Sequence, residues 1–183
     1  MKRSRLVFSG SGGQGLITAA IILAEAAVLH EGLNAVQSQS YGAAARGGVT
    51  RSDIIISNED IDYPKVMQPN VLVTLTQEAY NSTYRIVRPG GLLITDTHFV
   101  TQRGTADATH QNLPLYDKVM ERIGKPIVLN ICMLGALQAL TDLVSMESLR
   151  QVIRDRVPSA FLDMNHQALE LGGEVARTGQ DEA

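Results

Sequence analysis

The feature that most constrains this chain is a run of glycines between a short apolar segment and a long alanine- and leucine-rich one. Gly10-Ser11-Gly12-Gly13-Gln14-Gly15 follows Arg5–Ser9 and precedes Leu16–His30. The spacing matches the G-x-G-x-x-G fingerprint of strand–turn–helix units that bind dinucleotides. Glycine lets the backbone approach a ligand, and the free N–H groups of a helix start attract anions. The whole turn is therefore a candidate cofactor-binding site: Gly10, Ser11, Gly12, Gly13, Gln14 and Gly15.

The fingerprint is incomplete. A nicotinamide or flavin site usually has an aspartate or glutamate near the end of the second strand, where it binds the ribose hydroxyls. Here that strand ends Val36-Gln37-Ser38-Gln39-Ser40 and contains no carboxylate. We therefore do not expect NAD binding. Two explanations of the turn stay open: close packing of strand on helix, or contact with an anionic ligand or a partner subunit.

A second unusual segment is Tyr41-Gly42-Ala43-Ala44-Ala45-Arg46-Gly47-Gly48. Arg46 beside two glycines is a guanidinium on a backbone that can come close to another molecule. It could bind a phosphate or a carboxylate, or form an intersubunit salt bridge. A solvated arginine on a loop is the alternative. The segment adds four candidate binding residues: Tyr41, Arg46, Gly47 and Gly48.

Apolar segments alternate along the chain between strand-like and helix-like patterns. We predict an α/β fold, a three-layer sandwich with a mixed, mostly parallel sheet, formed by residues 1–183 as one domain. The predicted strands are Arg5–Ser9, Asn34–Ser40, Val49–Ser57, Val71–Thr76 and Leu92–Asp96. The predicted helices are Leu16–His30, Gln77–Val87 with Thr76 as N-cap, Tyr116–Ile123, Asn130–Leu143, Met146–Arg156 and Ser159–Leu171. We expect Thr97–Leu113 to be irregular, and the tail 174–183 to fray after Gly172-Gly173.

Composition excludes several functions. A net charge of −3 disfavours bulk binding to nucleic acid or to a membrane surface. The single cysteine, Cys132, is expected to pack as a small apolar residue, and one cysteine cannot hold an iron–sulfur cluster or form an intrachain disulfide. The four histidines are scattered, so no metal site is expected. We interpret Asp96-Thr97-His98 as a solvated strand end. Without a signal peptide or a long apolar segment, a cytoplasmic location is expected.

The two glycine segments, taken with later motifs, resemble the gamma subunit of the 2-oxoacid:ferredoxin oxidoreductases. Gly12–Gly15, Gln39–Gly42 and Arg46-Gly47-Gly48 carry the resemblance in the first part of the chain. It continues through Arg51–Ser57, Ile61-Asp62-Tyr63-Pro64, Pro89-Gly90-Gly91, Asn130 and Leu134-Gly135. Relatives tend to carry a proline and an acidic residue where this chain has Ala43-Ala44-Ala45.

The resemblance implies a Rossmann-like domain that works only inside a larger enzyme. The family reaction is the oxidative decarboxylation of a 2-oxoacid, with electrons passed to ferredoxin and the acyl group to coenzyme A. It implies thiamine diphosphate, Mg²⁺ and iron–sulfur clusters in partner alpha and beta subunits, and in a ferredoxin-like delta subunit where one is present. No catalytic residue is expected in this chain, although its glycine turn and Arg46 would suit a wall of a coenzyme A site.

Gln39-Ser40-Tyr41-Gly42 and Ile61-Asp62-Tyr63-Pro64 resemble the 2-oxoglutarate enzymes of the family more than the pyruvate enzymes. The resemblance therefore implies 2-oxoglutarate as the substrate, with pyruvate second. The alternative function is a free-standing nucleotide-binding or regulatory α/β domain.

Overall fold

The computed structural model describes residues 3–41 and 49–181. Its centre is a single sheet whose strands lie in the order β2-β3-β1-β4-β5-β6. The strands are β1 (Arg3–Ser11), β2 (Asn34–Tyr41), β3 (Val49–Ser57), β4 (Val71–Thr74), β5 (Gly91–Asp96) and β6 (Ala108–Leu113). β1, β4, β5 and β6 are parallel neighbours, whereas β3 runs antiparallel to both β1 and β2. The predicted mixed, mostly parallel sheet is confirmed.

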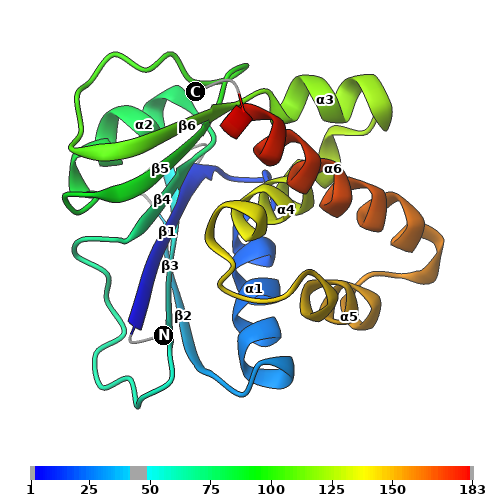
Figure 1. Cartoon of the computed structure of the whole chain (residues 1–183), viewed down its shortest axis with the longest axis horizontal. Helices are drawn as coiled ribbons and strands as arrows, with labels where there is room; N and C mark the ends of the chain where they lie inside the picture. Colours follow the sequence, from blue (N-terminus) through cyan, green and yellow to red (C-terminus); the bar gives the residue numbers. More distant parts are fainter. Residues whose placement is uncertain (1–2, 42–48, 182–183) are drawn as a thin grey trace.

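Helices cover the two faces of the sheet unequally (Figure 1). One face packs against α1 (Leu16–His30), α3 (Leu115–Arg122), α4 (Leu129–Thr141), α5 (Met146–Arg156) and α6 (Leu162–Asp181). Within the described residues, the other face carries only α2 (Gln77–Thr83) and the short 3-10 helix η1 (Tyr84–Ile86). The remaining 3-10 turns are η2 (Pro126–Val128) and η3 (Ser159–Phe161). The predicted three-layer sandwich is therefore present, with one thick and one thin helical layer.

Each layer has its own apolar core. The larger core joins Leu6 and Phe8 of β1 to the buried faces of α1 and α4. The smaller core joins Val7 of β1 to Tyr80 of α2. Successive residues of a strand point to opposite faces, so a buried central strand such as β1 must be apolar on both sides. α1 is apolar around most of its circumference for a similar reason: it is buried between the sheet, α4 and α5.

Several predicted boundaries are confirmed to the residue. α1, α5 and β3 have the predicted limits. Thr76 is the N-cap of α2, and its hydroxyl oxygen accepts a hydrogen bond from the backbone N–H of Ala79 at 3.2 Å. β2 and β3 pair antiparallel, which makes the sheet mixed, as predicted. Local signals, namely a capping threonine for α2 and an alanine- and leucine-rich composition for α1, were sufficient in these places.

Two expectations about the second half of the chain are wrong. Residues 108–113 are not irregular but form β6, a polar edge strand that pairs with β5 in parallel. α6 does not end at Gly172-Gly173 but continues to Asp181, so residues 174–181 are helical rather than frayed. Gly172 lies where α6 crosses α4, and a Cβ atom there would overlap with the carbonyl group of Cys132. The glycine permits a close helix crossing and does not end a helix.

Candidate functional site

The glycine-rich turn lies at a distinctive point of the sheet topology. After β1 the chain enters α1 on the thick side of the sheet, and after β4 it enters α2 on the thin side. β1 and β4 are parallel neighbours, so the carboxyl ends of these two strands form the topological switch point of the sheet. Open α/β sheets bind ligands outside the carboxyl ends of their strands at such a point.

Gln14 bridges the two strands at this switch point. Its side-chain oxygen accepts a hydrogen bond from the backbone N–H of Ser11 at 2.8 Å. Its side-chain nitrogen donates to the backbone carbonyl of Leu75, directly after β4, at 3.0 Å. The predicted ligand-binding role of Gln14 thus competes with a structural one, because both ends of its amide already have partners within the fold.

The glycines of the turn fall into two kinds. A Cβ atom on Gly10 would lie 2.6 Å from Cδ1 of Leu16, and one on Gly15 would lie 2.6 Å from Nδ2 of Asn130. Gly15 also has a positive φ of 71°, and Asn130 donates a hydrogen bond to its carbonyl at 3.1 Å. Gly12 and Gly13, by contrast, are exposed. Their nearest neighbour is Oγ1 of Thr50, 4.0 Å from a Cβ on Gly12, and a Cβ on Gly13 would meet nothing within 4 Å.

The first turn of α1 leaves positive potential at this open part of the turn. The N-cap is Gly15, which has no capping side chain, and the first turn contains no acidic residue. The backbone N–H groups at a helix start carry a partial positive charge. A groove of about 470 Å³ begins beside Gly13 and Gly15 and extends between α1, α4 and α6. It is lined by Gly13, Gly15, Thr18, Ile22, Ile127, Val128, Asn130, Ile131, Arg156, Val157, Phe161, Met164 and Asn165.

The second predicted segment is only partly visible. β2 ends at Tyr41, and the backbone of Tyr41 pairs with Thr50 in β3. Arg46, Gly47 and Gly48 lie outside the described residues, as do residues 42–45. The hairpin register places Tyr41 and the first residue of β3, Val49, at the same end of the sheet as Ser11. Tyr41, the described residue of the second segment, therefore lies at the end of the sheet where β1 leads into the glycine turn.

Arg51 does not have the free guanidinium that an anion site would need. Its Nε donates to Oδ1 of Asp53 at 2.6 Å, and its Nη2 donates to the backbone carbonyl of Val66 at 2.5 Å. Arg51 and Asp53, two residues apart on β3, form an ion pair. Together they attach the β3–β4 connection to the sheet.

Asp96 at the end of β5 is not the solvated residue that we expected, because it is fully buried. Its carboxylate accepts hydrogen bonds from the backbone N–H groups of His98 at 2.9 Å and Tyr116 at 2.7 Å. Burial raises the pKa of Asp96, and these two donors oppose the rise. The signal in the sequence was Pro114: it is the N-cap of α3 and has no side chain that can accept a hydrogen bond, so the first N–H groups of α3 need an acceptor from elsewhere.

Cys132 is buried in α4, as expected. Burial, and then the neighbouring charge of Asp96, raise the pKa of its thiol to about 12. A thiol with such a pKa carries almost no thiolate at neutral pH and is a poor nucleophile or ligand. Among residues 3–41 and 49–181, no group of three or more His, Cys, Asp or Glu side chains could hold a metal ion. None of the helices in those ranges is long and apolar enough to cross a membrane. The cytoplasmic location stays a prediction.

Fold and site together define an α/β domain with a glycine-rich turn at the switch point of a mixed sheet. Residues 5–175 match the family model described as pyruvate ferredoxin/flavodoxin oxidoreductase. The chain therefore belongs to this family.

Its curated relatives are subunits of 2-oxoacid oxidoreductases. The chain is 43% identical over 177 residues to 2-oxoglutarate synthase subunit KorC of Methanocaldococcus jannaschii, a match that covers 96% of this chain and 95% of the relative. It is 32% identical to ketoisovalerate oxidoreductase subunit VorA of Methanothermobacter thermautotrophicus, over 94% of this chain and 36% of the relative.

Solved structures agree. The gamma subunit of a keto/oxoacid ferredoxin oxidoreductase from Geobacter sulfurreducens has a TM-score of 0.90 and 39% identity, covering 98% of this chain and 99% of that one. The 2-oxoglutarate:ferredoxin oxidoreductase of Magnetococcus marinus, solved with 2-oxoglutarate, coenzyme A and succinyl-CoA, shares the fold with a TM-score of 0.88, 22% identity and coverage of 97% of this chain and 32% of that one. The resemblance to gamma subunits is confirmed: this chain is a subunit of an oxidoreductase complex. The free-standing alternative finds no support.

Proposed function

We propose that this chain is the gamma subunit of a 2-oxoglutarate:ferredoxin oxidoreductase and forms one wall of its coenzyme A site. The observation that carries the proposal is the open part of the glycine turn: Gly12 and Gly13 are exposed beside the uncapped start of α1. Coenzyme A carries phosphates, and a helix start with free N–H groups favours a phosphate. The adjoining groove is largely apolar with a few polar groups, and such a groove can accept the pantetheine arm of coenzyme A, which has both methylene and amide groups.

The remaining candidate residues have distinct parts in this proposal. Ser11 and Gly12 provide backbone next to the ligand, and Gly10, Gln14 and Gly15 hold the turn in shape through the contacts described above. Tyr41, Arg46, Gly47 and Gly48 are proposed to line the same site, because the hairpin brings Tyr41 to that end of the sheet. Arg46 would supply the positive charge for a phosphate.

Thiamine diphosphate, Mg²⁺ and the iron–sulfur clusters are proposed to lie in partner alpha and beta subunits, and in a delta subunit where present. A single buried cysteine with a raised pKa supports this division, since a cluster needs several thiolate ligands. 2-Oxoglutarate is preferred over pyruvate because the KorC subunit of M. jannaschii is more similar to this chain than the pyruvate synthase subunit PorC of Methanothermobacter marburgensis, which is 30% identical.

A negative charge introduced at Gly12 tests whether the glycine turn lines the coenzyme A site. Gly12 has ordinary φ and room for a side chain, and an acidic residue near a helix start favours folding. We therefore expect Gly12→Asp to fold and assemble, and to raise the KM for coenzyme A about tenfold or more through repulsion of a phosphate, with the KM for 2-oxoglutarate little changed.

The matched control is Asn81→Asp, which adds the same charge at an exposed position of α2. An aspartate there keeps the oxygen that accepts a hydrogen bond from Gln77. Steady-state kinetics of the assembled enzyme should separate the two variants. Equal coenzyme A kinetics in wild type, Gly12→Asp and Asn81→Asp would contradict a coenzyme A phosphate at this turn.

A further inference from the structure

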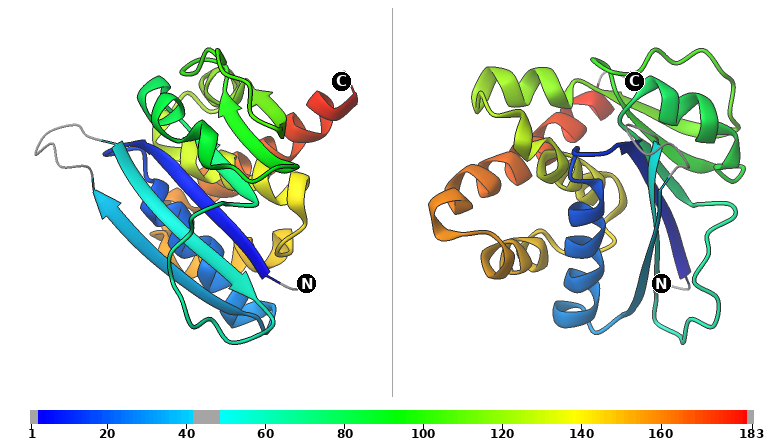
Figure 2. Two further views of the ribbon diagram at one scale, coloured as in Figure 1. Left: turned by 90° about the vertical axis from the view of Figure 1, so that its left-hand side faces the viewer. Right: turned by 180° about the vertical axis from the view of Figure 1, so that it is seen from behind.

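The connection between β3 and β4, residues 58–70, contains no helix or strand. A connection of this length without secondary structure is uncommon in a compact domain and is usually either functional or disordered. Figure 2 (left panel) shows it crossing in front of the strands, on the face of the sheet away from α1. This connection contains the Ile61-Asp62-Tyr63-Pro64 motif, to which the proposed coenzyme A site assigns no role.

Hydrogen bonds hold this connection to the sheet at several points. Arg3 donates from Nη2 to the carbonyl of Asp60 at 2.7 Å. Arg51 donates to the carbonyl of Val66 at 2.5 Å, and the N–H of Val66 donates to Oδ2 of Asp53 at 3.1 Å. The side chains of Arg51 and Asp53 are only 27% and 13% exposed. The loop is thus held in one shape by a half-buried ion pair that uses both polar backbone groups of Val66.

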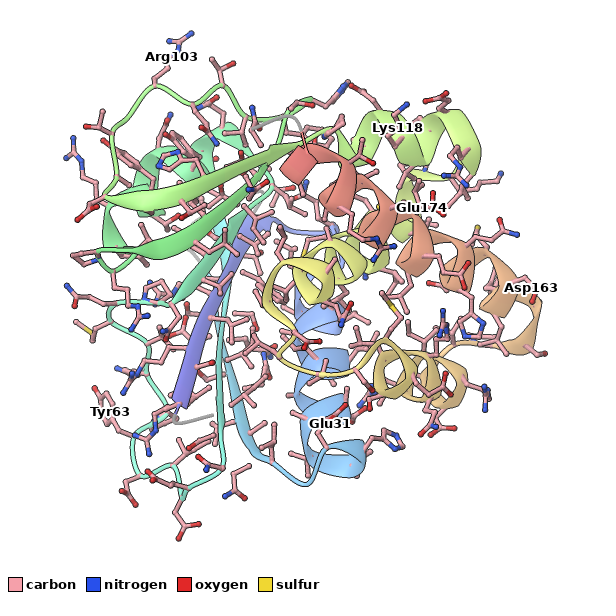
Figure 3. The ribbon with its side chains drawn as sticks, viewed as in Figure 1. Glu31, Tyr63, Arg103, Lys118, Asp163 and Glu174 are labelled. Carbon is pink, nitrogen blue, oxygen red and sulfur yellow. The ribbon has the colours of Figure 1, made fainter. Side chains whose placement is uncertain are left out.

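The fixed loop presents two large side chains to solvent. Val66 is buried in the smaller core, whereas Tyr63 is 60% exposed and Met67 is 74% exposed. Figure 3 shows Tyr63 on the outer side of the loop, away from the strands. Tyrosine and methionine are enriched in protein interfaces, and a tyrosine on a rigid backbone loses little entropy when it is buried by a partner. The loop therefore has the properties of a preorganised contact surface.

The charges on the loop indicate the chemistry of its partner. Glu59, Asp60, Asp62 and Lys65 are exposed, which gives an excess of negative charge around Tyr63. None of these four charged groups forms an ion pair with a residue in the described ranges 3–41 and 49–181. Unpaired acidic groups at the rim of an apolar contact favour a partner with basic groups at the matching positions.

We propose that residues 58–70 form a docking loop for another subunit of the oxidoreductase complex. The contact face of that subunit would carry an apolar pocket for Tyr63 and Met67, with arginine or lysine side chains at its rim. The inference rests on the proposed assembly with alpha and beta subunits, and it adds to that proposal the surface through which this chain is held.

The test is the affinity of this chain for the co-expressed alpha and beta subunits, measured by surface immobilisation of those subunits. We expect Tyr63→Ala to raise the Kd about thirtyfold, as for the removal of a central interface anchor, and Met67→Ala to raise it about tenfold. Leu29→Ala is the matched control, because Leu29 is 64% exposed but belongs to α1, which covers the opposite face of the sheet from the loop (Figure 2). It should leave the Kd unchanged, and all three variants should keep the wild-type melting temperature.

Charge reversal provides an independent measure. Asp62→Lys should slow association severalfold at low salt, and the loss should diminish as ionic strength rises. Unchanged affinity in both Tyr63→Ala and Asp62→Lys would overturn the docking loop. So would self-association of the wild-type chain that Tyr63→Ala abolishes, because the occupant would then be a second copy. In either case an assembled, active wild-type complex would leave the proposed function standing, whereas a wild-type chain that bound neither subunit would contradict that function itself.

Discussion

The glycines at the crossing of α4 and α6 differ from those in the turn after β1 in the atoms that surround them. At the crossing of α4 and α6, a Cβ on Gly135 or Gly172 would meet backbone of the opposite helix: the carbonyl groups of Leu169 and Cys132. In the turn after β1, Gly15 meets a side chain, Asn130, and Gly13 meets nothing within 4 Å. A packing glycine is recognised by its neighbour within the fold. Gly13, which has no such neighbour, leaves open space beside its backbone.

The largest effect is expected at the helix crossing. Gly172→Ala would place a methyl group against the carbonyl of Cys132, which cannot move without separating α4 from α6. We expect a loss of about 3 kcal/mol in the free energy of unfolding, as for an overpacked core. Gly173→Ala is the adjacent control: its Cβ would lie 3.3 Å from the flexible end of Arg177, and alanine favours a helix. Chemical denaturation should show Gly173→Ala as stable as wild type or more so. Two equally stable variants would contradict the close crossing.

A smaller effect is expected where the turn meets α4. Gly15→Ala combines a left-handed backbone with a contact 2.6 Å from Nδ2 of Asn130, so we expect a loss of about 2 kcal/mol. Gly13→Ala has the positive φ without the neighbour, and should lose only about 1 kcal/mol. In an Asn130→Ala background the cost of Gly15→Ala should fall towards that of Gly13→Ala. A double-mutant cycle with no coupling would show that Asn130 does not constrain Gly15.

Substitutions of Gln14 test whether its side-chain hydrogen bonds stabilise the glycine turn. Gln14→Ala removes the acceptor for the N–H of Ser11 and the donor to the carbonyl of Leu75, so we expect a loss of about 1 kcal/mol. Gln14→Glu keeps the acceptor but turns a carboxylate towards that carbonyl, and should be no more stable than Gln14→Ala. Thermal unfolding measures both. A Gln14→Ala variant with wild-type stability would leave the side chain available to a ligand.

The smallest effect concerns the junction of α1 with α5, where Glu31 lies (Figure 3). The hydroxyl of Ser148, at 2.6 Å, and the N–H of Ser145, at 2.7 Å, donate to its carboxylate and lower its pKa from 4.5. A lowered pKa contributes stability above pH 4.5 that is lost as the pH falls through the folded-state value. Glu31→Gln should therefore cost under about 1 kcal/mol at pH 7, and the cost should shrink below pH 4.5. A difference that grew with acid would contradict these contacts.

Much of the fold was predictable because the local sequence of several elements favours the same secondary structure that packing in the folded domain requires. The alanine- and leucine-rich composition of α1 and the capping hydroxyl of Thr76 predicted these two helices without reference to the rest of the chain. β6 was missed because it is an edge strand with mostly polar residues on both faces, so its sequence lacks the alternation of apolar and polar residues. It is a strand because its backbone pairs with β5. The end of α6 was missed because a glycine pair in sequence does not reveal whether another helix lies against it.

The candidate site was predictable in place but not in detail. The position of the glycine turn between β1 and α1 followed from its sequence context. The division between Gly15, held by Asn130, and the open Gly13 did not, because Asn130 is distant in sequence and only the fold brings it to the turn. The same holds for the hydrogen bond from Arg51 to the backbone carbonyl of Val66, which depends on the path of the β3–β4 connection.

The central claim is that this chain contributes structure and binding surface to an enzyme whose redox chemistry lies in its partners. The most direct measurement is 2-oxoglutarate-dependent reduction of ferredoxin, with thiamine diphosphate, Mg²⁺ and coenzyme A present, by this chain alone, by the alpha and beta subunits alone, and by all three together. We predict no turnover by the chain alone and full turnover only when all three are combined. Turnover by the isolated chain, or full coenzyme A-dependent turnover by the alpha and beta subunits without it, would contradict the claim.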